Sequence, residues 1–459
     1  MQIVKHEHEF LAPEEINGLK DTYGVERVQA FVDKTRQRDF DLVLNGRHVS
    51  FMEKTETLGL DHDFRLKYYI GASWLFEPNS GDDESGVSIV VRPKIQNIDY
   101  IKMFLIALDF NGEEEKYFSD FYYIDYDKPQ ITLSSPDTML TPLLLIHFIK
   151  LLEPIVARGL KRGYITRDEN LKSKVKGKIL FQRHLSKNIL NRREDRVFCR
   201  YQEFSEDILE NRLLKKALLF TQSVIGQYEY FNKYKEDLYP KIQKLLTAFE
   251  NVSEDVTVSQ IVTFSANKLF RGYTDAIKVA KQILKQFDYS IENTDEENNH
   301  VVYPFCIDMP RLYEMYTLKI LRDAYHGQIL FQQRGYGQTQ IDYLKIGDEK
   351  LCIDAKYKPR YANGQNDVLD DIREISGYAR DEKLLRILWN GELLPDHPWV
   401  KCVIIYPEWP NSEYIANGGN METIYTLDPR VNLLSQRNIR MVNGYRDFYF
   451  LGLPIPTFE

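Results

Sequence analysis

The amino-acid sequence predicts a multidomain α+β protein with a mostly-β N-terminal domain, a helical middle region and a C-terminal α/β domain. The chain has 459 residues, and at about 150 residues per domain this length predicts two or three domains. Hydrophobic residues make up 43% and charged residues 28% of the chain, a composition that is typical of a folded protein with large cores. The hydrophobic spacing changes twice along the chain, and these changes place the domain boundaries.

Residues 1–135 form the first predicted domain. Apolar and aromatic residues alternate with a period of two in the segments 67–71, 86–95 and 117–126. This spacing is typical of strands, and we expect a small barrel or sandwich.

Residues 136–293 form the second predicted domain, in which the spacing becomes helical. The apolar residues between Ile208 and Leu218 are spaced as on one face of a helix. The same helical spacing occurs in the segments 239–251 and 266–287. The polar, charged stretch 294–300 predicts a linker that ends this domain.

Residues 294–459 form the third predicted domain, a mixture of helices and strands. We expect a helix over 312–324, a hairpin of strands 338–346 and 350–357 around the turn 347–349, a helix over 368–385 and a buried strand over 400–407.

Several classes of protein are excluded or disfavoured. No run of 18 uncharged apolar residues exists and the first residues lack a signal-peptide core, so we expect neither a membrane span nor secretion. The four cysteines lie far apart without a CxxC motif, which favours a reducing cytoplasm over a disulfide framework or a zinc site. The sequence has no GxxxxGK[ST] motif and therefore no P-loop for a nucleotide.

The charge is distributed unevenly. The net charge of −8 argues against nucleic-acid binding, because phosphates are bound by lysine and arginine. Between Arg158 and Arg200, however, fourteen basic residues stand against four acidic ones, so this segment carries +10 and the remainder carries −18. The segment therefore needs its own explanation.

The predicted hairpin brings two carboxylates together. If residues 347–349 form the loop, Asp342 faces Asp354 and Gln340 faces Lys356. Opposed Cβ atoms lie about 5 Å apart, and two like charges at that distance repel unless a cation lies between them.

Hard oxygen ligands of this kind suit Mg²⁺. We predict that Asp342, Asp354 and the backbone carbonyl of Ala355 hold the metal and that Lys356 orients or deprotonates the attacking water, which implies phosphodiester hydrolysis. Glu314 lies among bulky residues of the preceding helix, and if it points inward it would hold a water bound to the metal. The alternative is an edge hairpin with surface charges and a solvated Glu314.

These residues resemble the PD-(D/E)xK nucleases, and more closely the McrC family, the nuclease subunits of modification-dependent McrBC restriction systems. The likeness covers most of the chain. Its matching segments are 69–71, 90–95, 157–164, 175–179, 199–207, 211–215, Leu312-Tyr313-Glu314, Ile341-Asp342, 354–358 and 404–407.

The resemblance implies a restriction-endonuclease-like fold for the C-terminal domain and a Mg²⁺-dependent cut in double-stranded DNA. It also implies a McrB-like AAA+ GTPase ring as partner, which binds the GTP, takes up the N-terminal domain and is stimulated by this subunit. Two copies of the nuclease domain would cut opposite strands.

This sequence departs from the family pattern at two positions. Ile341 replaces the usual proline before the first acid. Glu374 stands where the helix after the lysine often carries glutamine, so we do not assign a catalytic role to that helix.

The basic segment has three possible explanations: a solvated helix surface, a track for DNA phosphates, or a docking face for an acidic surface of the ring. For the DNA alternative we predict contacts from Lys172, Lys174, Lys176, Lys178, Lys358 and Gln340. We expect Glu206, Asp207, Asn211 and Arg212 to form a structural network at a helix start.

Two other functions remain open from the sequence: a non-catalytic DNA-binding adaptor, and a nuclease of a related defence system that acts on unmodified sites.

Overall fold

The computed structural model describes residues 2–9, 11–24, 42–44, 47–49, 52–54, 64–78, 86–95, 97–107, 122–125, 128–133, 140–227, 229–256, 271–292, 300–302, 304–337, 339–358, 369–392, 398–408 and 427–457. The chain divides into two compact units. One unit joins Met1–Ser135 to Asn299–Glu459, and the other is Pro136–Asn298. The second unit is therefore an insertion in the sequence of the first.

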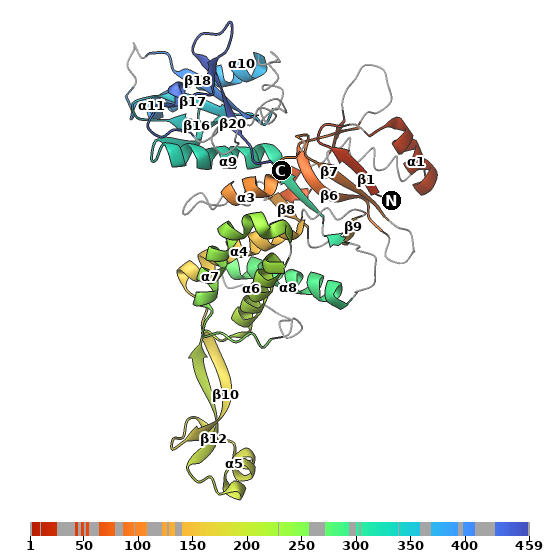
Figure 1. Cartoon of the computed structure of the whole chain (residues 1–459), viewed down its shortest axis with the longest axis vertical. Helices are drawn as coiled ribbons and strands as arrows, with labels where there is room; N and C mark the ends of the chain where they lie inside the picture. Colours follow the sequence, from red (N-terminus) through yellow and green to blue (C-terminus); the bar gives the residue numbers. More distant parts are fainter. Residues whose placement is uncertain are drawn as a thin grey trace. The chain divides into compact units, whose positions relative to one another are not determined.

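An N-terminal sheet organises the first part of the larger unit (Figure 1). Among the described residues its strand order is β1-β7-β6-β14-β8. Strand β1 runs parallel to β7, whereas the β6–β7, β6–β14 and β14–β8 pairs are antiparallel. The strands are β1 (Gln2–His6), β6 (Tyr69–Phe76), β7 (Val87–Arg92), β8 (Tyr122–Ile124) and β14 (Phe305–Asp308).

Strand β14 joins the two outer segments of the chain. The sequence predicts residues 1–135 and 294–459 as separate domains, but Cys306 pairs with Gly71 on one side and with Tyr123 on the other. Gly71 has a φ of +140°, and a Cβ there would lie 2.2 Å from the carbonyl oxygen of Phe305, so only glycine allows this close approach. The outer segments thus share one sheet and one core.

Smaller elements complete the N-terminal part. The helices are α1 (Pro13–Tyr23) and α3 (Tyr100–Ala107). Short antiparallel pairs are formed by β2 (Leu42–Leu44) with β3 (Arg47–Val49), β4 (Met52–Lys54) with β5 (Phe64–Leu66), and β9 (Ile131–Leu133) with β13 (His300–Val302). The core beneath the sheet includes Ile3, Leu11, Leu75, Val87, Ile89, Val91 and Cys306.

A second, mixed sheet forms the C-terminal part, with the order β15-β16-β17-β18-β20-β19 among the described residues. Strands β17, β18 and β20 run parallel to one another, whereas the β15–β16, β16–β17 and β19–β20 pairs are antiparallel. The strands are β15 (Ile329–Arg334), β16 (Gln340–Lys345), β17 (Leu351–Ala355), β18 (Lys401–Glu408), β19 (Ile439–Met441) and β20 (Phe448–Pro454). The hairpin and the buried strand expected from the sequence are present as β16, β17 and β18.

Helices cover this sheet. Helix α9 (Met309–Ala324) is the helix predicted over 312–324, and the Asp308 carboxylate caps it by accepting the backbone N–H of Arg311. Where one helix is predicted over 368–385, the structure has α10 (Leu369–Tyr378) and α11 (Glu382–Leu388). The break occurs because the Asp381 side chain accepts the backbone N–H groups of Lys383 and Leu384 and starts a new helix.

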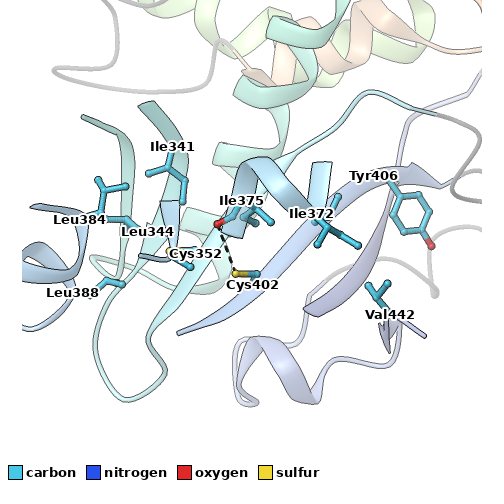
Figure 2. Close-up of a cluster of buried hydrophobic side chains, with 12 residues drawn as sticks. Ile341, Leu344, Cys352, Ile372, Ile375, Leu384, Leu388, Cys402, Tyr406 and Val442 are labelled. Atoms are coloured by element: carbon cyan, nitrogen blue, oxygen red, sulfur yellow. Dashed lines mark hydrogen bonds between the residues drawn. The ribbon is translucent and has the colours of Figure 1, made fainter. Parts of the chain in front are cut away.

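A hydrophobic cluster joins these helices to the sheet (Figure 2). Ile372 and Ile375 of α10 and Leu384 and Leu388 of α11 pack against residues of β16, β17 and β18. The strand residues in the cluster are Ile341, Leu344, Cys352, Cys402, Ile404 and Tyr406. Burying one such side chain contributes about 2 kcal/mol to the free energy of unfolding, and the cluster fixes α10 beside the end of β17.

The inserted unit has a helical body and a β-hairpin (Figure 1). The helices are α4 (Leu140–Arg158), α6 (Leu209–Gln227), α7 (Lys235–Ala248) and α8 (Arg271–Glu292), with the 3-10 helix η3 (Glu229–Tyr234) before α7. Helix α6 contacts both α7 and α8, and α4 contacts both of these as well. Of the predicted linker over 294–300, residues 294–299 lie outside the described residues, and His300 begins strand β13.

One of the explanations from the sequence places the basic segment on a solvated helix surface. The structure does not agree with this explanation. The segment lies almost entirely in a projecting hairpin, which we call the arm (residues 163–205; Figure 1). Strands β10 (Gly163–Lys172) and β12 (Arg196–Ser205) form its antiparallel stem. The remaining elements of the arm are β11 (Lys178–Ile179), α5 (Phe181–Lys187) and the 3-10 helix η2 (Ile189–Asn191).

Cys199, Cys306, Cys352 and Cys402 are buried and free. Among the described residues, no helix combines the length and the apolar character that a membrane crossing requires. A short 3-10 helix, η8 (Leu433–Ser435), precedes β19.

Candidate active site

The hairpin β16–β17 has the register that the sequence predicts. Tyr343 lies opposite Ile353 and Leu344 opposite Cys352. Directly beyond these pairs the same register places Asp342 opposite Asp354, and the backbone N–H of Ala355 donates a 2.8 Å hydrogen bond to Oδ2 of Asp342. The two carboxylates expected from the turn length are therefore neighbours in the structure.

Burial and mutual repulsion raise the pKa values of these acids. Asp354 is 3% exposed, and burial, followed by the charge of Asp342, raises its pKa well above the usual range. Burial and then the charge of Glu314 raise the pKa of Asp342 to about 8, against the opposing effects of the Ala355 N–H and of Lys356. Such crowding of a buried and a half-buried acid is unfavourable for folding and is typical of functional sites.

Glu314 belongs to the same electrostatic group. Burial raises its pKa to about 7, with Arg311 acting in the opposite direction and Asp354 adding to the rise. Arg311 donates a hydrogen bond to Oε2 of Glu314, and the hydroxyl of Tyr343 in β16 donates to the Glu314 carbonyl at 2.7 Å. The structure thus brings together the acids Glu314, Asp342 and Asp354.

Lys356 supplies the cation next to these acids. Its Nζ lies 2.8 Å from Oδ2 of Asp354 and 2.8 Å from Oε2 of Glu374. Burial by itself would lower the pKa of Lys356, but the carboxylates of Asp354 and Glu374 outweigh burial and raise it. Lys356 is therefore a hydrogen-bond donor at neutral pH.

Glu374 is the residue of the site that the sequence reasoning leaves out. Besides Lys356, it accepts a 3.0 Å hydrogen bond on Oε1 from the hydroxyl of Tyr378. Glu374 and Tyr378 are four residues apart in α10, so their side chains share one face of that helix. This spacing is visible in the sequence, but only the packing of α10 shows that the face meets Lys356.

Two residues predicted to bind DNA lie nearby. Lys358 donates hydrogen bonds of 2.6 and 2.7 Å to both oxygens of the buried Asp371, so its charge is already paired. Gln340 begins β16 and pairs with Arg334 of β15. The backbone N–H of Lys356 donates to the carbonyl of Ile405 in β18. Among the described residues, the β16–β17 pairing covers Tyr343–Lys345 and Leu351–Ile353, so Gln340 is not paired with Lys356.

The donor set fits Mg²⁺. Within the described residues, no group of three or more His, Cys, Asp or Glu side chains has the arrangement of a metal site. Mg²⁺, however, takes one or two protein carboxylates, keeps several waters and accepts substrate phosphates. The opposed carboxylates of Asp342 and Asp354, whose pKa values are raised first by burial and then by neighbouring carboxylates, and the adjacent carbonyl of Ala355 are such a set.

The remaining predicted DNA-binding residues, Lys172, Lys174, Lys176 and Lys178, lie in the arm. Lys176 lies 3.9 Å from Glu203 and 4.0 Å from the ring centroid of Tyr201. Several other basic residues of the arm are paired across its strands, such as Arg200 with Asp168 at 2.6 Å. Among the described residues, those of the basic segment without an ion pair are Arg158, Lys172, Lys174, Lys178, Lys187, Arg192, Arg193 and Arg196.

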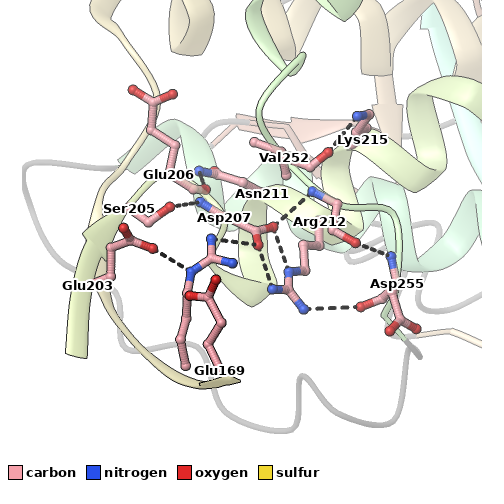
Figure 3. A network of polar contacts seen from close by, with 12 residues as sticks. Glu169, Glu203, Ser205, Glu206, Asp207, Asn211, Arg212, Lys215, Val252 and Asp255 are labelled. Carbon is pink, nitrogen blue, oxygen red and sulfur yellow. Dashed lines mark hydrogen bonds and ion pairs between the residues drawn. The ribbon is translucent and has the colours of Figure 1, made fainter. Parts of the chain in front are cut away.

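The network expected at the start of α6 is confirmed (Figure 3). Arg212 donates hydrogen bonds of 2.8 and 2.7 Å to the two oxygens of Asp207, which also accepts the backbone N–H of Ser253. Asn211 donates to the carbonyls of Lys161 and Glu206. These contacts fasten the base of the arm to the helical body, which is a structural role.

Comparisons with known proteins agree with the resemblance. Residues 83–373 match the family model described as "McrBC 5-methylcytosine restriction system component". No curated protein sequence matches.

Two solved structures from Thermococcus gammatolerans are similar in part. One is a half-complex from a tetradecameric assembly of McrB AAA+ hexamers with bound McrC, at 14% identity and a TM-score of 0.37, covering 99% of this chain and 94% of that chain. The other is a McrBC complex, at 14% identity and a TM-score of 0.28, covering 71% of this chain and 88% of that chain.

Proposed function

The chain belongs to the family of McrBC 5-methylcytosine restriction system components, and from that premise we propose that it is the Mg²⁺-dependent DNA endonuclease subunit of a GTP-driven restriction complex. The observation that carries the proposal is the proximity of Asp342 to Asp354 at the end of the β16–β17 hairpin, where the Asp342 carboxylate accepts the Ala355 N–H and Lys356 lies 2.8 Å from Asp354. Two opposed acids followed by a lysine are the residue set of a metal-assisted phosphodiester hydrolysis.

Asp342, Asp354 and the carbonyl of Ala355 would hold Mg²⁺. When bound, Mg²⁺ supplies a water of lowered pKa and neutralises negative charge on the phosphoryl oxygens. Asp342 and Asp354 must be ionised to serve as ligands, so Mg²⁺ would compete with a proton at Asp342, whose pKa is raised to about 8.

Lys356 has the properties of a donor. Because it is protonated next to Asp354 and Glu374, it can hold the attacking water or a phosphate oxygen by a charge-assisted hydrogen bond. Glu374, itself held by Tyr378, fixes the direction of the ammonium. Glu314, beside Asp342, would accept a hydrogen bond from a water in the site and so restrict its orientation.

We further propose a McrB-like AAA+ GTPase ring as partner and the cytoplasm as the place of action. Membership of a restriction-system family supports a partner, and the absence of a P-loop from the sequence agrees with GTP being bound by another chain. Double-stranded DNA is the substrate, and a second copy of the nuclease domain would cut the opposite strand.

The unpaired basic residues of the arm support contact with an anionic partner. DNA is one candidate, since phosphates bind exposed lysines and arginines without sequence preference. An acidic surface of the ring is the other. The Lys172, Lys174 and Lys178 side chains are exposed and unpaired among the described residues, which suits either partner.

A reconstituted cleavage assay tests the proposal. The chain, the GTPase partner, GTP and Mg²⁺ are incubated with cytosine-methylated and unmethylated duplexes, and the products are separated by length. We expect cleavage of methylated DNA that requires all four components. No cleavage under any condition would favour a non-catalytic DNA-binding adaptor, and equal cleavage of both duplexes would favour a nuclease that acts on unmodified sites.

A further inference from the structure

The segment that carries Lys356 lies beyond the regular part of its strand. Strand β17 ends at Ala355, and residues 356–358 belong to neither a strand nor a helix. The position of the Lys356 backbone therefore depends on individual contacts. Two of these contacts are made within the C-terminal part of the larger unit. The Lys356 N–H donates to the carbonyl of Ile405, and the Lys358 ammonium binds the Asp371 carboxylate.

A third contact comes from the N-terminal part of the unit. Nζ of Lys94 donates a 2.9 Å hydrogen bond to the backbone carbonyl of Tyr357, the residue directly after Lys356. The same ammonium lies 4.2 Å from the centroid of the Tyr357 ring, which is a cation–π contact. Lys94 is thus held to both the backbone and the side chain of Tyr357.

Lys94 itself is fixed by a buried acid. Its backbone N–H donates a 2.9 Å hydrogen bond to Oε2 of Glu7, which is 3% exposed. The backbone N–H of Glu7 donates in turn to the carbonyl of Arg92, at the end of β7. The Arg92-Pro93-Lys94 turn is therefore anchored to the N-terminal sheet before its lysine reaches Tyr357.

Tyr357 links the Lys94 contact to helix α9, which carries the acid Glu314. Tyr357 is 4% exposed, and its ring lies 6.0 Å from that of Tyr313, the residue before Glu314 in α9. A shift of Tyr357 would therefore disturb Lys356 through the backbone and Glu314 through the packing of the two rings.

We propose that Lys94 is a positioning residue for the nuclease reaction, which holds Tyr357 so that the ammonium of Lys356 meets Asp354 and Glu374. This inference rests on the proposed endonuclease function. Lys94 is not placed at the acids of the site or at the proposed substrate. Its effect is transmitted through the backbone of residues 356–358, and a small misplacement of a catalytic group costs up to about a hundredfold in rate.

The test compares three variants of the full chain. Lys94→Met keeps the length of the side chain but removes the donor, and Lys94→Arg keeps a cationic donor. Lys5→Met is the matched control, because Lys5 lies in strand β1 next to β7 and is half-buried like Lys94, with an ion pair of 2.9 Å to Glu15. All three are compared in single-turnover cleavage, in GTPase stimulation and in hydrogen exchange of the peptide that covers residues 351–358.

We expect Lys94→Met to lower the cleavage rate constant by about 10- to 100-fold while the complex concentration at half-maximal rate and the GTPase stimulation stay unchanged. Amide exchange of residues 356–358 should be faster by about three- to tenfold. Lys94→Arg should recover most of the cleavage rate, and Lys5→Met should behave as wild type. If Lys94→Met does not fold, Lys94→Gln, which is too short to reach Tyr357, replaces it.

Unchanged exchange of residues 356–358 in Lys94→Met would overturn the inference, as would an equal loss of cleavage in Lys5→Met or no recovery in Lys94→Arg. Hydrogen exchange needs neither DNA nor a partner. If the wild-type chain does not cleave, the endonuclease proposal fails, and unchanged exchange would separately show that Lys94 does not hold the segment.

Discussion

Nζ of Lys356 lies 2.8 Å from Oδ2 of Asp354, a carboxylate that is almost completely buried. A buried acid next to a second, half-buried acid, Asp342, requires a compensating positive charge. In the described structure Lys356 provides part of this compensation, and a divalent cation would provide the remainder. The arrangement explains why the lysine is placed next to the acid instead of being exposed on the hairpin surface.

Glu374 should act through hydrogen bonds more than through its charge. Glu374→Gln retains an oxygen that accepts from Lys356, so the cleavage rate should fall by no more than about threefold. Glu374→Ala removes the acceptor and should lower the rate by about tenfold or more, because Lys356 loses the contact that orients it. Asp370→Ala is the control, since Asp370 lies in the same helix but its side chain is 90% exposed. An equal effect of the Gln and Ala changes would contradict this role.

Mg²⁺ should stabilise the protein more at alkaline than at acidic pH. The folded-state pKa values of Asp342 and Glu314, about 8 and about 7, lie above the ordinary values of these acids. The folded protein then binds more protons than the unfolded chain between pH 4 and 8, so the metal-free protein loses stability as the pH rises through that window. Metal ligands must be ionised, and the apparent Kd for Mg²⁺ should rise about tenfold per pH unit below pH 7.

Thermal unfolding with and without saturating Mg²⁺, at about pH 6 and about pH 8.5, measures this effect. The rise in Tm caused by Mg²⁺ should be larger at the higher pH and absent in Asp342→Asn. The same rise at both pH values would show that these acids do not bind the metal.

The exposed lysines of the arm should decide between its two proposed partners. If they contact DNA, the combined change Lys172→Ala, Lys174→Ala and Lys178→Ala should weaken DNA binding and reduce the dependence of log K on log salt by up to about 0.9 per lost phosphate contact. GTPase stimulation should then be unchanged. Loss of stimulation with unchanged DNA binding would instead assign the arm to the ring. Lys244→Ala, in an exposed position of α7 outside the arm, is the control.

The Asp207–Arg212 pair should contribute substantially to the stability of the inserted unit. Asp207→Ala leaves Arg212 and the Ser253 N–H without their acceptor, and the free energy of unfolding should fall by about 2–4 kcal/mol. Arg162→Ala removes the ion pair between Arg162, whose side chain is 59% exposed, and Glu206. The free energy of unfolding should then fall by less than about 1 kcal/mol. Chemical denaturation measures both changes, and equal losses would contradict the assignment.

The same pair gives a pH dependence of known sign. Burial opposes ionisation of Asp207, but Arg212 and the Ser253 N–H outweigh it and hold the pKa of Asp207 below its usual range. The stabilisation is therefore present above the ordinary pKa of an aspartate and is lost as the pH falls through the lowered value.

The sequence predicts the site better than the arrangement that surrounds it. The turn at 347–349 fixes the register of β16 and β17 and so brings Asp342 close to Asp354, because hairpin register follows from loop length. The contact of Glu374 with Lys356 depends on how α10 packs on the sheet, through Ile372 and Ile375. Apolar periodicity shows that this helix packs, but it does not show which polar residue meets the lysine.

Neither the arm nor the shared sheet was predicted from the sequence. The reason differs between the two. Strand β10 is exposed over most of its length, so it lacks the apolar alternation that indicates a strand, and cross-strand pairs such as Arg200 with Asp168 accompany its pairing with β12. Strand β14 pairs with β6, more than two hundred residues earlier in the chain. A pairing over such a distance leaves no local signal in the sequence.

Single-turnover cleavage of methylated duplex by Lys356→Ala tests the central proposal most directly, with GTPase stimulation measured in the same reaction. Lys350→Ala is the matched control, because Lys350 lies at the opposite end of β17 and binds the carbonyl of Gly347 in the turn. The account predicts that Lys356→Ala cleaves at least about a hundredfold more slowly with unchanged GTPase stimulation, and that Lys350→Ala resembles the wild type. Cleavage by Lys356→Ala at the wild-type rate, or loss of both activities in a folded protein, would contradict it.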